Sequence, residues 1–375
     1  MEIDKHKLYD CVIIGGGLAG LCLAIQLAKN EHSVLLIEKN KYPFHKVCGE
    51  YISMESYAFI QSLGVNLDGM NLPKINQLNI TSHNGYKISS RLAMGGFGIS
   101  RYTLDYELSN IAKKSGVIVI ESCHANHVKL QNDLYSVETT KGSFNSKLVC
   151  GSYGKIEPAF IESKDGKKKG NYIAVKYHIK TNIPDNLIEL HNFNDGYCGI
   201  SKVDNDTVCL CYLTTTKNLN ENGNDIKELE RNVLMKNPDL KRYFTESKFV
   251  FEKPLAISQI GFRKKDTYKN EVLLLGDSAG AIAPLCGNGM SIAMRSSKII
   301  SGYITMYLQN KLTKSELIKQ YDREWNRNFS LRIKSGYYLQ KLFGKRLTTL
   351  VALKSLNTFP FLFRKLITLT HGNKF

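Results

Sequence analysis

A glycine cluster near the start of the chain carries the clearest chemical signal. Residues 9–14 predict a buried strand before it, and residues 18–29 predict an apolar-periodic helix after it. Gly15 permits a tight turn, Gly17 lets the backbone approach a pyrophosphate at the helix N-terminus, and Gly20 allows close packing of helix on strand. The residues expected to contact a dinucleotide phosphate are Gly15, Gly17, Leu18, Ala19 and Gly20.

An acidic residue follows the glycine cluster at the spacing that a dinucleotide site requires. Glu38 ends the second predicted strand, at residues 33–38, and its carboxylate is placed to accept hydrogen bonds from both ribose hydroxyls. Lys39 comes next and is included in the expected cofactor site. A carboxylate at this place disfavours a 2′-phosphate, so NADP is not expected to bind there.

A second strand–turn–helix with small residues lies far along the chain. A buried strand at residues 271–275 delivers Gly276 and Asp277, and a long helix is predicted over residues 289–308. Asp277 is placed to accept from a ribityl hydroxyl, and the backbone N–H groups of residues 288–290 could face the N1/C2=O edge of a flavin. The further expected contacts of this motif are Gly287, Gly289 and Met290.

The order of these motifs resembles one flavoprotein superfamily, that of aromatic hydroxylases and geranylgeranyl reductases, over roughly residues 8–310. The stretch Arg101-x-x-Leu104-Asp105 is part of the resemblance, and Lys46-x-Cys48-Gly49 resembles the reductase branch in particular. The resemblance implies FAD as cofactor, with Arg101 on its phosphate or adenosine side and residues 46–50, including Lys46 and Cys48, beside the flavin.

The chain departs from its resembled families at three places. Hydroxylases carry an Ala-Asp-Gly motif where this chain has residues 150–154 without an acid, although NAD(P)H remains the expected electron donor. Reductases carry a Tyr-x-Trp-x-Phe-Pro segment where this chain has residues 196–200 without Trp or Pro. The Trp-x-Trp-x-Ile-Pro signature of flavin halogenases is absent, and the single tryptophan is Trp325, so the sequence does not predict a halogenase.

No acid–base pair stands out as the catalytic machinery. His45, Cys48 and Tyr197 are the candidate catalytic residues, and His191 is a further candidate for the substrate pocket. Cys209-x-Cys211 places two thiols on one strand face, but no matching ligand pair is evident and no metal site is expected.

The predicted elements indicate an α/β protein: a Rossmann-like FAD-binding domain interrupted by a mainly antiparallel β substrate domain, with a C-terminal helical segment. Lys167 to Lys169 are expected in a solvated loop. The expected parts are residues 1–72, 95–155 and 256–310 for the FAD-binding domain, 73–94 (a hairpin) and 156–255 for the substrate domain, and 311–375 for the basic helical segment.

The positive charge gathers in the last part of the chain. The net charge is +17, and residues 326–375 hold ten Lys or Arg and no Asp or Glu, interleaved with apolar residues. This pattern suits an anionic membrane surface or an acidic carrier protein, while no motif favours nucleic acid. The alternative is that the apolar residues simply close the core. No secretory or membrane-spanning pattern was found, so the expected location is cytoplasmic, with peripheral membrane association as an option.

These observations favour an FAD-dependent oxidoreductase that acts on an apolar, aromatic, isoprenoid or carrier-bound substrate. A monooxygenase is preferred because that outcome is common in the resembled superfamily. The alternatives are an alkene reductase like the geranylgeranyl reductases, a non-redox lipid cyclase or isomerase that needs flavin, and a lipid-binding escort protein.

Overall fold

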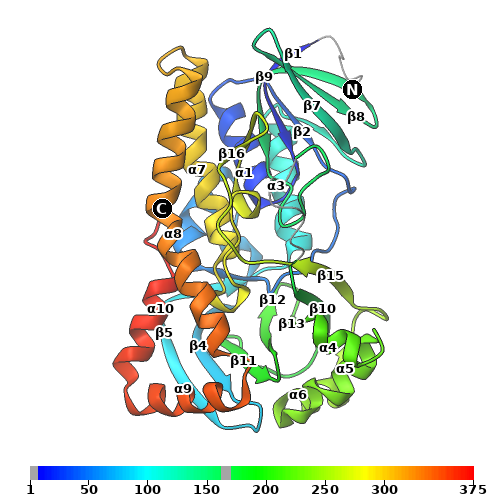
Figure 1. The fold of residues 1–375 in the computed structure, drawn as a ribbon, viewed down its shortest axis with the longest axis vertical. Helices are drawn as coiled ribbons and strands as arrows, with labels where there is room; N and C mark the ends of the chain where they lie inside the picture. The colour runs from blue at the N-terminus through cyan, green and yellow to red at the C-terminus, as the bar shows by residue number, and fades with distance from the viewer. Residues whose placement is uncertain (1–6, 162–169) are drawn as a thin grey trace.

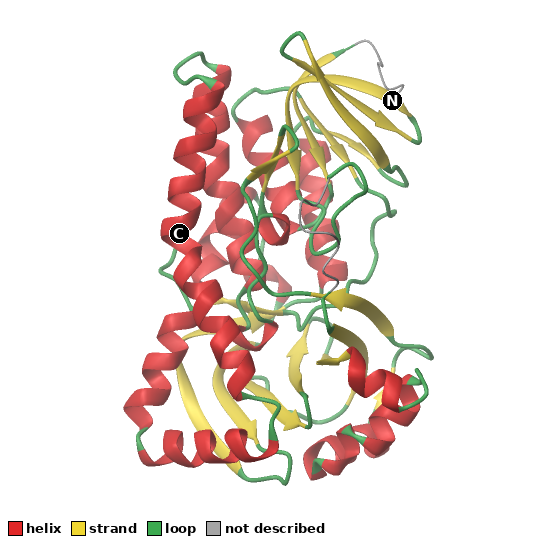
Figure 2. Cartoon of the chain, in the orientation of Figure 1, coloured by secondary structure: helices red, strands yellow, loops and turns green. Residues whose placement is uncertain are grey.

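The computed structural model describes residues 7–161 and 170–375. Two sheets lie one above the other in Figure 1, and a bundle of helices runs along one side of both, as the colours of Figure 2 show. The upper sheet contains the glycine cluster and the lower sheet the expected substrate strands. The expected loop at Lys167 to Lys169 lies outside the described residues.

The upper sheet has the order β16-β17-β9-β1-β2-β6, and its central strands β17, β9, β1, β2 and β6 pair in parallel. Parallel strands covered on both faces read as continuous apolar runs, which is why β1 and β2 are almost wholly buried. The strands are β1 (Leu8–Ile14), β2 (Val34–Ile37), β6 (Ile118–Ile120), β7 (Ala125–Gln131), β8 (Leu134–Thr139), β9 (Gly142–Gly151), β16 (Tyr268–Lys269) and β17 (Val272–Leu274).

The helices that cover the upper sheet pack through their apolar faces. The apolar faces of α1 and α7 contribute to the same buried core as the strands. Trp325 and Phe329 of α8 complete this core, with no exposed area. The helices are α1 (Leu18–Lys29), α2 (Tyr57–Leu63), α3 (Arg101–Lys114), α7 (Gly289–Leu308) and α8 (Lys314–Leu342).

The lower sheet has the order β14-β10-β13-β12-β11-β4-β5-β3, with β15 paired to β10. Its pairs are antiparallel except that β11 runs parallel to β4. The strands are β3 (Tyr51–Ser53), β4 (Lys74–Thr81), β5 (Lys87–Gly98), β10 (Tyr172–Lys180), β11 (Leu187–Phe193), β12 (Gly196–Val203), β13 (Thr207–Thr215), β14 (Lys248–Phe249) and β15 (Leu255–Ile260).

The chain crosses between the two sheets more often than the expected boundaries imply. Strand β3 lies in the lower sheet, although it falls within residues 1–72. Strand β5 continues to Gly98, past residue 94, and β15 straddles the boundary at residues 255 and 256. The order of elements along the chain predicts approximate boundaries, whereas strand pairing in the folded protein decides which sheet a segment joins.

Two further local differences have clear physical reasons. Strand β7 carries only a short apolar alternation, Val128 and Leu130 between exposed polar residues, which is too brief to predict a strand from the sequence. The sequence of residues 226–245 predicts one helix, but the segment is divided because Asn237 caps a new helix whose first residue is Pro238. The pieces are α5 (Ile226–Asn232), a 3-10 turn at Leu234–Lys236 and α6 (Pro238–Glu246), and the separate short helix α4 (Thr216–Glu221) precedes them.

The C-terminal helices turn under the lower sheet and cover it. Helix α9 (Arg346–Thr358) and helix α10 (Pro360–Thr370) follow α8 at the lower left of Figure 1. Leu353, Leu356 and Phe363 bury their side chains against residues of the lower sheet. Part of the basic segment therefore closes the core, which is the alternative to surface docking that its sequence also allows. Among the described residues, no helix is long and apolar enough to cross a membrane.

Candidate functional site

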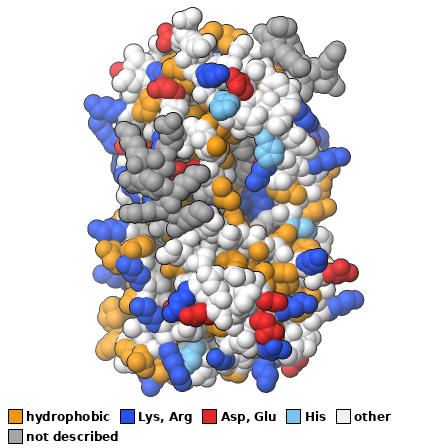
Figure 3. Space-filling model, turned by 45° about the vertical axis from the view of Figure 1, so that its right-hand side comes forward, with side chains coloured by type: hydrophobic (Ala, Val, Ile, Leu, Met, Phe, Trp, Pro, Cys, Tyr) orange, Lys and Arg blue, Asp and Glu red, His pale blue; other side chains and the backbone are white. Residues whose placement is uncertain are grey.

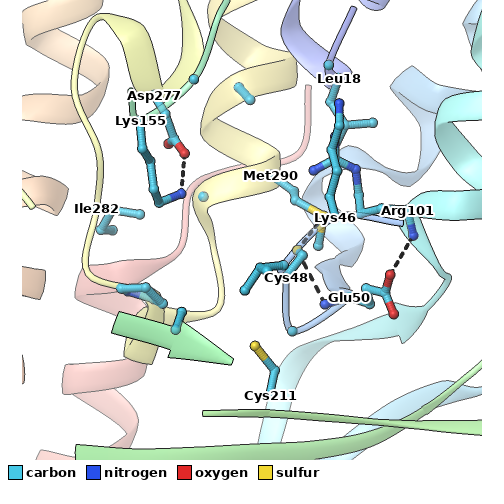
Figure 4. Close-up of a pocket in the computed structure, with 18 of the residues that line it drawn as sticks. Leu18, Lys46, Cys48, Glu50, Arg101, Lys155, Cys211, Asp277, Ile282 and Met290 are labelled. Atoms are coloured by element: carbon cyan, nitrogen blue, oxygen red, sulfur yellow. Dashed lines mark hydrogen bonds and ion pairs between the residues drawn. The ribbon is translucent and has the colours of Figure 1, made fainter. Parts of the chain in front are cut away.

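A cavity of about 950 Å³ lies between the two sheets. The glycine cluster, the segment before Glu50 and the turn after β17 form one end, and the lower sheet with α8 to α10 forms the other. Figure 4 shows Lys155 and Asp277 on one side, Lys46 and Arg101 on the other, and Cys48 and Met290 between them. The volume lies at the upper end of the usual range for small-molecule sites.

The glycines of the cluster have different roles in this geometry. Gly15 has a φ of +107°, and a Cβ there would stand 2.6 Å from the carbonyl oxygen of Ser152. A Cβ on Gly20 would stand 2.1 Å from the carbonyl oxygen of Gly15, so helix and strand touch through their backbones. Gly17 is different, because a Cβ there would meet only the charged ends of Lys46 and Arg101, at 3.6 and 3.8 Å. Its open side is a cradle for an anion between backbone and cations.

The two cations beside Gly17 are held in place by one buried carboxylate. Arg101 donates from Nε and Nη2 to the two oxygens of Asp105, both at 2.7 Å, and Lys46 Nζ lies 3.1 Å from Oδ2. Burial disfavours the charged forms of these side chains, but the attraction of Asp105 for Arg101 and Lys46 outweighs burial. The pKa of Asp105 is lowered and the pKa of Arg101 is raised. Two positive charges against one negative leave the cradle with a net positive charge.

Glu38 lies beside the cradle as the sequence predicts, and only 4% of it is exposed. Its Oε2 accepts from Gly16 N at 2.8 Å, and its Oε1 accepts from Asn40 N at 2.9 Å and from Asn40 Nδ2 at 3.0 Å. These bonds fix the carboxylate at the cavity wall, where Lys39 also lies. Each oxygen retains lone pairs for ribose hydroxyls.

Asp277 pairs with a lysine that the sequence analysis missed. The ammonium of Lys155 forms an ion pair with the carboxylate of Asp277, and both side chains line the cavity. Burial alone would lower the pKa of Lys155, but the carboxylate of Asp277 outweighs burial, so the pKa is raised. Gly276 has a φ of +61° and its amide donates to Ser296 Oγ, which sets the turn that presents Asp277. The available signal was the position of Lys155, just past the end of β9.

The start of α7 completes this end of the cavity. Gly287 has a φ of +63°, and the helix begins at Gly289, so its first backbone N–H groups open toward the cavity that Gly289 and Met290 line. Cys48 Sγ lies 3.6 Å from Met290 Sδ. The 46–50 segment and the start of α7 therefore meet at the cavity.

The remaining sequence candidates lie in different surroundings. His45 packs between the rings of Tyr102 and Phe251, and burial, aided by the charge of Lys176, lowers its pKa to about 4. Tyr197 lines the cavity, and burial raises its pKa well above the usual value.

The expectation that His191 lines the pocket is wrong. Its neighbour Leu190 faces the cavity, and alternate residues of a strand face opposite sides. His191 is fully buried instead, 2.8 Å from Thr81 Oγ1 and 3.2 Å from Glu189.

A buried charge cluster around Glu50, which lines the cavity, was also missed. Glu50 accepts from Lys176 Nζ at 2.5 Å, from His178 Nε2 at 2.6 Å and from the backbone N–H of Arg101 at 2.7 Å. Burial would raise the pKa of Glu50, but His178 and Lys176 together lower it. Cys209 completes a group with Glu50 and His178 whose ligand atoms lie within 4.8 Å. The Lys176 ammonium already supplies the positive charge that a metal ion would bring, so we interpret the group as an internal ion pair.

Comparison with known proteins agrees with this geometry. Residues 13–47 match the family model of an NAD(P)-binding Rossmann-like domain. The chain is 22% identical over 365 residues to conditioned medium factor receptor 1 of Dictyostelium discoideum, covering 88% of this chain and 69% of that one. It is 27% identical over 343 residues to a digeranylgeranylglycerophospholipid reductase of Methanococcus vannielii, covering 85% and 83%.

The fold is also shared with solved flavoprotein structures. A flavin-dependent brominase superposes with a TM-score of 0.81 at 17% identity, covering 97% of this chain and 93% of that one. At that identity the likeness concerns the fold alone. The single tryptophan of this chain, Trp325, is buried against Gly280 and is not part of a halogenase signature. The fold and the site define a dinucleotide-binding oxidoreductase. In sequence and fold the chain is similar to FAD-dependent oxidoreductases, and this similarity identifies it as an enzyme of that general kind.

Proposed function

We propose that this enzyme reduces carbon–carbon double bonds in a long, isoprenoid-like lipid. The observation that carries the proposal is the continuity of the cavity. It runs without a break from the cradle at Gly17 to an apolar chamber between the lower sheet and α8 to α10. Side chains that wall the chamber include Leu78, Ile80, Leu92, Ile188, Phe343 and Leu356.

The residues at the upper end fit FAD. The open side of Gly17, with Lys46 and Arg101 beside it, suits the pyrophosphate, and Glu38 suits the ribose. Asp277, Lys155 and the first turn of α7 suit the ribityl and flavin end, where the helix N-terminus favours negative charge. Reduced FAD would supply the hydride, and the protein would orient the substrate and exclude water.

The chamber favours an extended aliphatic chain over a compact aromatic ring. Its walls are aliphatic and aromatic side chains from strands of the lower sheet and from helices α8 to α10, and Cys48 also lines the cavity. The similarity to a digeranylgeranylglycerophospholipid reductase extends over most of both chains. Although the sequence alone favoured hydroxylation, these two observations lead us to propose reduction first. Hydroxylation of the same chain would use the same cavity and is the alternative.

An anaerobic experiment separates the candidates. The flavin of the purified holoenzyme is photoreduced without oxygen and then mixed with a digeranylgeranyl phospholipid. A reductase reoxidises its flavin without oxygen, and each reduced double bond adds two hydrogens to the lipid mass. A monooxygenase reoxidises only when oxygen is admitted, and its product gains an oxygen atom. Lipid that is unchanged both without and with oxygen would contradict both reactions and favour a non-redox or escort role, because oxygen reoxidises reduced flavin even without a substrate.

The electron donor is tested on the same preparation. We propose NAD(P)H as donor, and NADH or NADPH added without oxygen should bleach the oxidised flavin. Failure of both nucleotides, while the photoreduced enzyme still turns over, would mean that a different donor serves this enzyme.

A further inference from the structure

The lower end of the molecule exposes a cluster of large apolar side chains. They lie between the last turn of α8 and the first turn of α10. Leu347 is 76% exposed, Val351 is 63% exposed and Phe361 is 59% exposed. Leu342, Phe359 and Leu362 are also exposed. We call these six side chains the apolar patch.

Basic side chains surround this patch, and acidic ones are missing from the same part of the chain. Lys345, Arg346 and Lys354 are exposed on α9 or at its start, and Lys341 and Lys365 are exposed on the neighbouring helices. The sequence contains no Asp or Glu after Glu324. Figure 3 shows hydrophobic and basic side chains side by side at the lower end of the molecule.

The helices that carry the patch outside also form the wall of the chamber inside. On α9, Leu356 faces the cavity while Leu347 and Val351 face solvent. On α10, Phe363, Leu366 and Ile367 face the cavity, next to the exposed Phe361 and Leu362. Only the thickness of one helix layer therefore separates the apolar patch from the substrate chamber.

We propose that the apolar patch and its basic neighbours dock the enzyme on an anionic lipid bilayer. Apolar side chains outside and Lys or Arg beside them are the pattern of helices that lie in a membrane interface. The basic side chains match anionic headgroups in charge, and the apolar ones enter the acyl boundary. Docking at this place would bring a membrane lipid next to the substrate chamber. This consequence rests on the proposed function, whereas the docking itself does not.

The two components of the surface are tested by sedimentation of the full-length holoenzyme with vesicles. Vesicles are made of phosphatidylcholine with and without phosphatidylglycerol, at about 0.15 M and about 1 M salt, where the Debye length falls from about 8 Å to about 3 Å. The enzyme should bind the anionic vesicles, and high salt should weaken binding at least tenfold. Each basic residue near an anionic surface accounts for about fivefold in affinity. The variant Lys345→Gln/Arg346→Gln/Lys354→Gln should therefore lose most of its binding.

An apolar variant and matched controls complete the test. Leu347→Glu/Val351→Glu should abolish vesicle binding at both salt concentrations. Leu134→Glu, at an exposed apolar residue of β8 in the upper sheet, and Lys114→Gln, at the exposed end of α3, should bind as the wild type does. Since all these positions are exposed, every variant should keep the wild-type melting temperature.

Several results would overturn the proposal. Equal binding by the patch variants and the controls would do so, as would wild-type protein that ignores anionic vesicles. Capture by an acidic carrier protein without vesicle binding would replace the membrane by a protein partner. Because sedimentation reads docking without turnover, failure of the reductase assay would leave this test intact.

Discussion

Lys155 and Asp277 form an ion pair across the carboxyl edge of the upper sheet, although 122 residues separate them in the chain. The parallel pairing of β9 with β17 brings them together, since Gly151 lies opposite Leu274. Strand β1 lies on the other side of β9, with Ile14 opposite Gly151. One sheet edge therefore presents the glycine cluster, Lys155 and Asp277 to the same cavity, as expected for ligands of open parallel sheets.

Asp277→Ala should weaken FAD binding by about 1–3 kcal/mol, the usual range for a lost hydrogen bond to a charged group. The substitution also leaves the buried end of Lys155 without its counter-charge. Titration of the apoprotein with FAD, followed by flavin fluorescence, measures the dissociation constant. Asp185→Ala is the control, because Asp185 pairs with Lys202 at an exposed site away from the cavity. Equal dissociation constants for the two variants would remove Asp277 from the FAD site.

Two glycine variants should separate cofactor binding from folding. Gly17→Ala adds a methyl group that meets no protein atom closer than 3.6 Å, so the apoprotein should keep its melting temperature. The same methyl group stands where the pyrophosphate is expected, and the FAD dissociation constant should rise at least tenfold. Gly20→Ala instead places its methyl group 2.1 Å from a backbone oxygen and should destabilise the apoprotein itself. Full flavin occupancy of Gly17→Ala would refute the phosphate cradle.

The parts of the site that the sequence predicted are those encoded locally. Gly17 and Glu38 follow successive strands of one βαβ unit, and Asp277 follows its own buried strand, so each can be read within a window of a few residues. The central parallel strands could be predicted for the same reason, because each is a short apolar run between turn residues.

Residues that act across the fold could not be predicted in this way. Lys155 gains its role from the pairing of β9 with β17, and Glu50 meets Lys176 and His178 only because β10 lies under the 46–50 segment. No local pattern records which segment a strand will face. A lysine in an apolar strand was the one visible anomaly, because a buried Lys requires a partner.

His45 should make the protein less stable in acid. Its pKa in the folded protein is about 4, below its ordinary value of 6.5, because burial disfavours the charged ring. The unfolded chain therefore binds a proton between these two values and the folded chain does not, so the free energy of unfolding should fall as pH drops from 6.5 to about 4. His45→Phe should flatten the urea-unfolding profile in this window. A step of the same size in wild type and variant would assign the acid sensitivity elsewhere.

Glu50→Ala should be among the most destabilising substitutions in the chain. It removes the partner of the fully buried Lys176 ammonium and of His178, and breaking a buried ion pair in this way costs about 3–5 kcal/mol. Urea unfolding of the apoprotein measures the loss. Glu228→Ala, which breaks the exposed pair with Arg231, should change the free energy of unfolding by less than about 1 kcal/mol.

The pH dependence of Glu50 variants gives an independent check of the same cluster. Because the pKa of Glu50 is lowered from 4.5 in the folded protein, its contribution is present above pH 4.5 and is lost as pH falls through the folded value. Glu50→Gln should therefore lose stability at neutral pH and show a smaller further loss in acid than the wild type. The double variant Glu50→Gln/Lys176→Met removes both charges and should recover part of the stability, since two neutral side chains avoid the desolvation of a lone ammonium. If Lys176→Met gave no recovery in the Glu50→Gln background, the buried ammonium would not be the source of the loss, and the ion pair would have no structural role at this place.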